Sequence, residues 1–125
     1  MNAIPICLKF HTQAAGNALC GFEALEDLTL VGASFSLDAV TGSPTTVTMD
    51  VNDDGAGIPG FTGVNVGTTA GVVTVVKTPH YGGSVAIPAD IVAGSEVDID
   101  LNISGGTSPT AGGTVVLWVL PGKKG

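Results

Sequence analysis

The chain has 125 residues, of which 44% are apolar, and four Lys, no Arg and eleven acidic residues give it a net charge of −7. A chain of this length buries about two-thirds of its surface around one core, so a single domain over residues 1–125 needs no disulfide or metal. So few cations argue against a nucleic acid or an anionic membrane as partner, and 19 glycines among many Val, Thr and Ser argue against a helical bundle.

The first 24 residues carry a weaker pattern than the rest of the chain. Ile4 to His11 is either the first strand or part of an extended arm over residues 1–24 that packs on a neighbouring subunit. Gly21 to Leu28 has apolar residues at helical spacing, but it is too short for a helix of its own, and we expect a connection into a strand. Cys7 and Cys20 pair only if adjacent strands place them opposite each other; in a reducing cytosol we expect two small buried side chains.

The segment from Leu28 to Leu37 changes the parity of its apolar residues. Leu28 and Leu30 occupy even positions, whereas the large apolar residues from Val31 onward occupy odd ones. Because side chains alternate between the two faces of a strand, this change requires an extra residue. We therefore predict a β-bulge or bend near Val31 and Gly32, since glycine tolerates a bulge.

The next segment, Thr46 to Asn52, alternates cleanly and leads into a turn signal. Asp50 to Gly55 matches the opening of a calcium loop, D-x-N-x-D-G, but the bidentate Glu required at its twelfth position is Phe61 here. Asp-Gly after a strand is the usual signal of a tight hairpin turn. We favour the turn over a cation site.

The following segments also have the pattern of strands. Val72 to Val76 and Ser84 to Ile87 are short runs, and Glu96 to Ile103 alternates without a break. In the last of these, Asp98 and Asp100 fall on the outward side. This predicts a solvated face rather than a catalytic carboxylate pair, because a catalytic acid needs an apolar pocket that raises its pKa.

The segment from Thr114 to Leu120 has apolar residues at both its odd and its even positions. Such a run is typical of a central strand that is covered on one side by the core and on the other by a partner or a loop. Trp118 is therefore expected in the densest layer of the core or at a subunit contact.

Together these segments predict an all-β fold. We expect an antiparallel β-sandwich or jelly roll of about eight strands, with no significant helix. The residues expected to face the core are Val47, Met49, Val51, Val97, Ile99, Leu101 and Ile103.

The sequence assigns no catalytic, cofactor-binding or metal-binding residues. His11 and His80 are the only imidazoles, and neither accompanies a G-x-S-x-G elbow or a cysteine in a nucleophile setting. The Gly-rich segments contain neither G-x-G-x-x-G before a helix nor a Walker loop. We therefore predict no enzyme activity, no cofactor and no small-molecule substrate.

Three segments resemble the small β-sandwich domains of tailed-bacteriophage structural proteins. They are VTMDVNDDGAGI (Val47 to Ile58), IPADIVAGSEVDIDLNISGG (Ile87 to Gly106) and TVVLWVLPG (Thr114 to Gly122). The resemblance covers about residues 45–122 and consists of strand and turn signatures. Such domains occur in capsid decoration (cement) proteins, head fibres and tail-associated proteins, and the one-domain length is most similar to a decoration protein.

The resemblance implies a function in the virion. A decoration protein of this kind is made in the cytoplasm of the bacterial host, forms a homotrimer and binds the major capsid protein on the exterior of the head, which it stabilises. Its N-terminal arm would contact a neighbouring subunit or the capsid. The alternative is a head-fibre or tail-associated module for adsorption or carbohydrate contact, although one Trp, one Tyr and four Phe leave little for stacking on sugars.

Overall fold

Alternating apolar and polar residues produce two antiparallel sheets in the computed structural model, which describes residues 3–78 and 89–122. The strands are β1 (Ile4–Gln13), β2 (Gly16–Glu23), β3 (Leu28–Thr41), β4 (Thr46–Asp53), β5 (Ala56–Gly57), β6 (Val64–Asn65), β7 (Val73–Lys77), β8 (Ala89–Ile91), β9 (Glu96–Ser104) and β10 (Thr110–Pro121). Sheet A has the order β1-β10-β3-β7, with β8 pairing another part of β3. Sheet B has the order β2-β9-β4-β5, with β6 also on β4.

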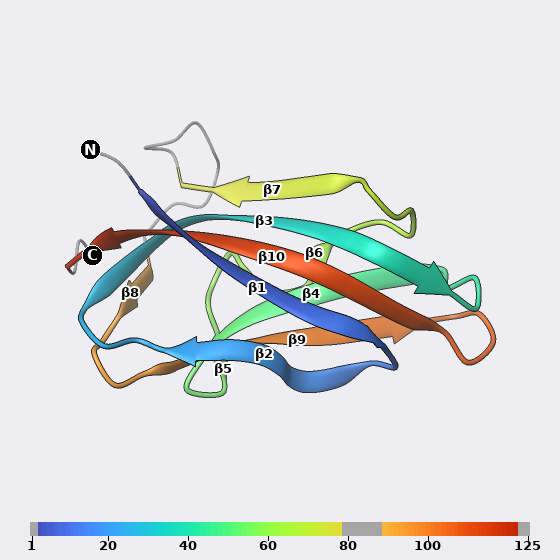
Figure 1. The fold of residues 1–125 in the computed structure, drawn as a ribbon, viewed down its shortest axis with the longest axis horizontal. Helices are drawn as coiled ribbons and strands as arrows, with labels where there is room; N and C mark the ends of the chain where they lie inside the picture. Colours follow the sequence, from blue (N-terminus) through green and yellow to red (C-terminus); the bar gives the residue numbers. More distant parts are fainter. Residues whose placement is uncertain (1–2, 79–88, 123–125) are drawn as a thin grey trace.

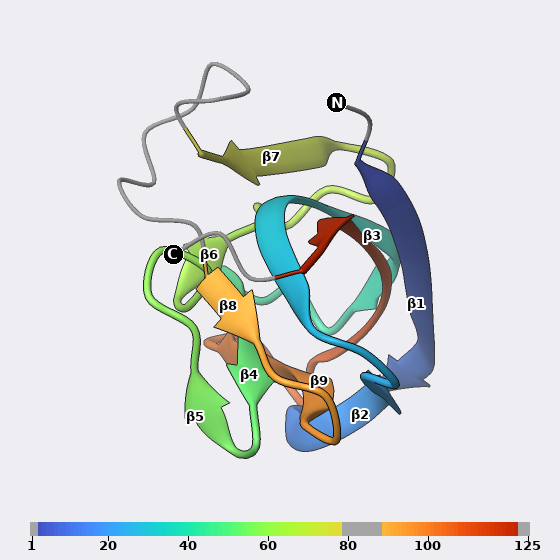
Figure 2. The ribbon, with the colours of Figure 1, turned by 90° about the vertical axis from the view of Figure 1, so that its left-hand side faces the viewer.

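The two sheets form the layers of a sandwich (Figures 1 and 2). Consecutive strands from β1 to β4 alternate between sheet A and sheet B, and β9 and β10 do the same. The described residues form no helix. The all-β sandwich predicted from the sequence is confirmed, whereas the jelly-roll winding stays a prediction.

The inward side chains of both sheets meet in one core. Phe35 and Leu117 of sheet A and Met49 and Ile99 of sheet B are fully buried. Burying a side chain of this size contributes roughly 1.5–3 kcal/mol to stability. All seven residues predicted to face the core do so: six are at most 1% exposed, and Ile103 is half-buried and packs against them.

β3 contains the predicted bulge. Trp118 of β10 lies opposite Gly32, but the next residue, Val119, lies opposite Leu30, so Val31 is the extra residue on β3. Leu30 and Val31 are both buried. The bulge therefore keeps the apolar residues of both halves of β3 in the core despite their change of parity.

The predicted hairpin turn joins β4 to β5. Asp53 pairs with Ala56, which leaves Asp54 and Gly55 at the tip. Their φ angles of 51° and 83° are both positive, as in the type I′ turn that matches the twist of a hairpin.

The N-terminal segment supplies one strand to each sheet. β1 pairs with β10 of the same chain and buries Leu8 and Phe10, and β2 pairs with β9. Where Gly21 to Leu28 was considered for a helix, β2 continues to Glu23 and a bend leads into β3. Contacts of this segment with a neighbouring subunit or a capsid stay a prediction.

The remaining strands differ from the predicted set in number and place. The run predicted at Val72 to Val76 forms β7, one residue later. Ser84 to Ile87 lies outside the described residues. The sequence did not indicate β2, β8, β5 or β6; the last three have only two or three residues each.

Candidate functional site

The outer side of sheet B is acidic. The register places Asp50 of β4 opposite Asp100 of β9, and Glu23 of β2 opposite Glu96 of β9. Alternation along β9 directs Asp98 to the same side, away from the buried residues. We term these five residues the acidic face.

Hydrogen bonds hold Asp50, Asp98 and Asp100 of the acidic face along the open sheet. Asp50 accepts bonds from the Gly63 N–H at 2.6 Å and from the side-chain amide of Asn102 at 3.1 Å. Asp98 accepts one from an Asn side chain of β4 at 3.1 Å, and Asp100 accepts one from a backbone N–H of β2 at 2.9 Å. Asp98 and Asp100 are thus partly exposed groups on the outward side of β9, as the alternation predicted.

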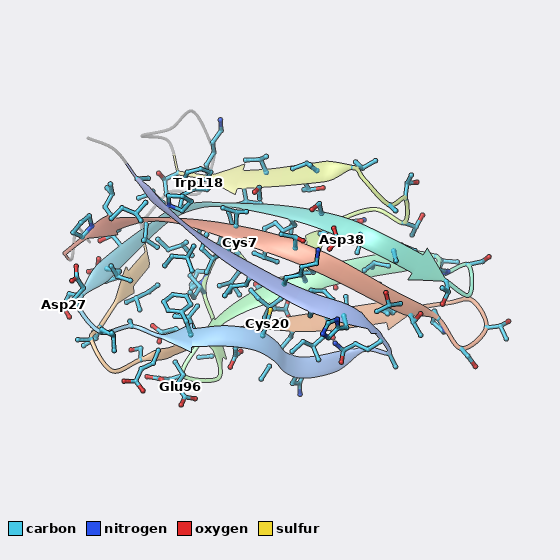
Figure 3. All side chains as sticks on the ribbon, viewed as in Figure 1. Cys7, Cys20, Asp27, Asp38, Glu96 and Trp118 are labelled. Atoms are coloured by element: carbon cyan, nitrogen blue, oxygen red, sulfur yellow. The ribbon has the colours of Figure 1, made fainter. Side chains whose placement is uncertain are left out.

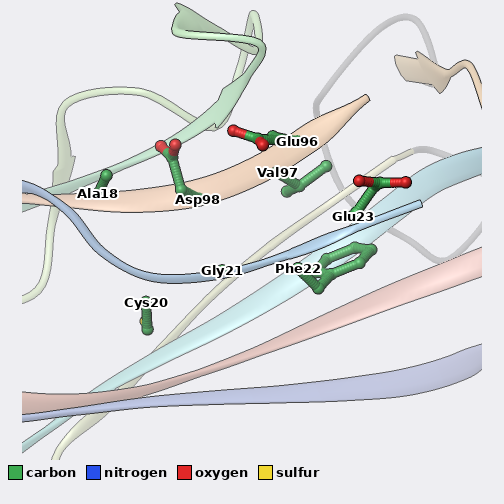
Figure 4. A pocket seen from close by; sticks show the side chains of 8 residues that line it. All are labelled: Ala18, Cys20, Gly21, Phe22, Glu23, Glu96, Val97 and Asp98. Carbon is green, nitrogen blue, oxygen red and sulfur yellow. The ribbon is translucent and has the colours of Figure 1, made fainter. Parts of the chain in front are cut away.

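A groove of about 300 Å³ runs beside β2 and β9 (Figure 4). Carboxylates line one side of β2, while Cys20 and Phe22 point to the other side. Burial raises the pKa of the Cys20 thiol to about 11, and the charge of Asp98 adds to the rise. The thiol is therefore protonated at neutral pH and is not a nucleophile, because the thiolate is the reactive form.

The turn after β4 holds one perturbed carboxyl group. Burial raises the pKa of Asp53, a side-chain hydrogen bond with Ser95 opposes the rise, and the charge of Asp54 adds to it. One carboxylate oxygen of Asp53 is buried without a hydrogen-bond partner. Over residues 3–78 and 89–122, no group of three or more His, Cys, Asp or Glu side chains could hold a metal ion.

The two cysteines are both free. Cys20 is half-buried, but Cys7 is exposed, so the expectation of a buried side chain is wrong for Cys7. The reason is that Leu8 and Phe10 take the inward positions of β1, which turns the odd-numbered residues outward. His11 is exposed on the same strand, and His80 lies outside the described residues.

The outer side of sheet A differs in character from the acidic face. Three rows of outward residues cross β1, β10, β3 and β7 in register. Figure 3 shows Cys7 and Trp118 among the side chains of this sheet. We term the twelve residues of the three rows the neutral face: Pro5, Trp118, Gly32 and Lys77; Cys7, Val116, Ser34 and Val75; Lys9, Thr114, Ser36 and Val73.

The neutral face carries two lysines and none of the eleven acidic residues of the chain. Asp38 lies just beyond the rows on β3. It accepts a hydrogen bond from Thr114 at 2.9 Å and pairs with Lys9 at 3.6 Å. An ion pair this exposed contributes little to stability, but it offsets the charge of Lys9.

Trp118 is 38% exposed on this face, so the expectation that it lies in the densest layer of the core is wrong. Val115, Leu117 and Val119 take the inward positions of β10 and are buried. Val116 and Trp118 therefore point outward. The other expectation for Trp118, a subunit contact, stays a prediction.

No protein-family model, curated protein or solved structure matches this chain. In the part of the chain that the structure describes, no helix is long and apolar enough to cross a membrane.

The neutral face as a whole was not found from the sequence. The two-sided apolar pattern of Thr114 to Leu120 indicated that the outer side of one strand is covered. The other rows come from β1, β3 and β7, which are far apart in the chain and meet only through the register of sheet A. A further signal was available in β7, where Val73, Val75 and Val76 make both sides of the strand apolar.

Proposed function

We propose that the protein is a capsid decoration (cement) protein that binds the outer surface of a phage head as an oligomer and stabilises the shell. The observation that carries the proposal is the unequal charge of the two outer faces, acidic on sheet B and almost free of carboxylates on sheet A. A protein that coats a shell needs one surface for proteins and another for water. The sandwich has a surface of each kind.

The acidic face suits the side that meets solvent. Charged groups on that side keep a coated particle soluble, because like-charged particles repel each other. The net charge of −7 also favours the exterior of the head, since packaged DNA would repel the chain on the interior.

The neutral face suits contact with proteins. The partners in this proposal are the major capsid protein and other copies of the chain, as a homotrimer, in line with the resemblance over residues 45–122. Each contact needs to contribute only a few kcal/mol, because many copies act together on one shell. Binding to the assembled shell and not to its separated subunits stabilises the shell by mass action.

In this proposal the protein acts by binding alone, without catalysis, cofactor or nucleic acid. The carboxylates of the acidic face support this, since Asp50, Asp98 and Asp100 are engaged in hydrogen bonds on an open sheet surface. The raised pKa of Cys20 supports it as well, because a protonated thiol is a poor nucleophile.

The copy number per particle tests the proposal. Virions from the host that makes this chain are purified, and the protein is quantified by mass spectrometry against the major capsid protein as internal standard. Copies in constant proportion to the major capsid protein are expected. A handful of copies would favour the head-fibre or tail-associated module instead, and absence from the particles would overturn the virion proposal.

A further inference from the structure

The neutral face has the layout of a protein interface. Its central row, Cys7, Val116, Ser34 and Val75, carries no charge, and the two lysines occupy diagonally opposite corners of the rows. Interfaces have an uncharged centre and a polar rim. A solvated sheet face instead carries polar or charged residues throughout, as the acidic face does.

The apolar side chains of this face are exposed in the isolated chain. Val73 and Val75 are 59% and 54% exposed, and Trp118 is 38% exposed. Val73 and Val75 lie on β7, whose only charged residue is Lys77 at its end. Among residues 3–78 and 89–122, β7 pairs only with β3, and it carries a single charge of the kind that normally protects an edge strand against association.

The distribution of charge favours another copy of this chain as the partner that covers the neutral face. At a net charge of −7, two copies repel each other in most orientations. The neutral face is an exception, because it contains Lys9 and Lys77 and no acidic residue. Asp38 lies beside the face and contacts Lys9 and Thr114. Contact between two neutral faces therefore leaves the acidic faces of both copies in water, whereas contact with an acidic face would remove its hydrogen-bonded carboxylates from water.

Sheet-on-sheet packing through the neutral face covers the outer side of sheet A as a whole. β1, β10, β3 and β7 have 10, 12, 14 and 5 residues. At ~4.8 Å between strands and ~3.4 Å per residue, these strands present roughly 670 Å² of flat area, of which the three rows of the neutral face make up about half. Projecting side chains add to this value, which brings the outer side of sheet A near the ~800 Å² per partner of a standard interface.

From these observations we propose that the neutral face packs against the neutral face of another copy of this chain, sheet on sheet. Aligned sheets pack with their side chains interdigitated at about 10 Å. The inference deepens the proposed function and rests on it for the expectation of an oligomer. A face that packs on its own counterpart joins two copies through a two-fold contact, so this contact by itself forms a dimer, and the homotrimer that the resemblance implies requires a further contact elsewhere on the chain.

Two valine substitutions of similar exposure test the contact. Val75→Glu places a charge in the central row, whereas Val92→Glu places the same charge on a valine that is 50% exposed between β8 and β9, away from the face. Molar mass is measured by light scattering over a wide range of concentration. We expect the wild type and Val92→Glu to associate, and Val75→Glu to weaken association at least about tenfold. Thermal melting of each variant shows that the fold is retained.

The Cys7 thiol reports on the same face without a disruptive substitution. Cys7 lies in the central row and is exposed in the isolated chain. In a Cys20→Ser background, alkylation of Cys7 by a maleimide should slow as the protein concentration rises and the faces meet. The same variant carrying Val75→Glu should react at one rate at all concentrations.

The outcomes separate this inference from the proposed function. Association that Val75→Glu leaves intact would place the contact elsewhere and overturn the inference. A wild type that stays monomeric, with Cys7 equally reactive at all protein concentrations, would also overturn the inference. If Cys7 is protected only when the protein is bound to phage heads, the neutral face contacts the capsid and not another copy. Association through the face by a protein absent from virions would support the inference and refute the cement function.

Discussion

At position 99, in the middle of β9, the isoleucine side chain is fully buried between the sheets. Its neighbours along the strand, Asp98 and Asp100, point to the acidic face. The stability of the sandwich therefore depends on a register in which a shift by one residue would turn these carboxylates and that of Glu96 toward the core.

Replacing Ile99 by Asp should unfold the protein, because it buries a charge without a partner. Ile99→Val is the matched control and should cost only about 0.5–1.5 kcal/mol, the effect of one lost methyl group. Thermal melting followed by circular dichroism measures both. An unchanged melting temperature for Ile99→Asp would contradict the register of β9.

Cys20 makes stability depend on alkaline pH. Its pKa rises from 9.0 to about 11 in the folded chain, chiefly through burial. Between these values the unfolded chain has lost the thiol proton and the folded chain has kept it. The free energy of unfolding should therefore carry the full contribution of Cys20 below pH 9 and lose it as the pH rises from about 9 to about 11.

Urea unfolding at a series of alkaline pH values measures this effect. Cys20→Ser should show a shallower decline than the wild type over that range. Equal declines in the wild type and Cys20→Ser would show that the thiol does not lose its proton more easily on unfolding.

Among the strands, those with unbroken alternation could be predicted from the sequence. β4 and β9 alternate without a break, and the parity change in β3 located its bulge at Val31. β2 could not be found in this way. Its register with β9 shifts between Gly16 and Cys20, and Ala18 has a φ of 52°, so its side chains do not alternate regularly.

The exposed positions in sheet A depend on tertiary pairing that the sequence pattern does not contain. Pattern alone allowed Trp118 either in the core or at a contact. The register of β10 between β1 and β3 decided that it points outward. Cys7 was misplaced for a similar reason, because the inward side of β1 is determined by Leu8 and Phe10, whose partners lie near the end of the chain.

Deleting residues 1–9 tests whether β1 is required for the sandwich. The deletion removes Leu8 from the core and exposes one edge of β10, so we expect a lower melting temperature and a lower free energy of unfolding. Deleting only residues 1–3 keeps β1 and should leave stability unchanged. A fully stable 1–9 deletion that no longer binds phage heads would instead support the N-terminal arm.

For the whole molecule, the arrangement of charge matters more than its sum. The eleven acidic residues leave one broad sheet surface almost free of carboxylates, so the chain can associate through that surface despite its net charge of −7. Contacts through uncharged side chains respond weakly to salt, whereas contacts through exposed ion pairs are screened. The proposed assembly should therefore persist at high ionic strength.

Phage heads without the protein should lose their DNA more easily, if the protein is a cement. Internal pressure acts on every junction of the shell, and each bound copy adds a small stabilisation that heating must overcome before the shell opens. DNA release is measured with an intercalating dye against temperature, for heads with and without the protein. Release should begin at a lower temperature in its absence, and adding back the wild type or Val92→Glu should restore the original curve. Val75→Glu should restore it only in part, because binding of separate copies lacks the contribution of their mutual contact. Indistinguishable curves with and without the protein would refute the cement function and favour the fibre alternative.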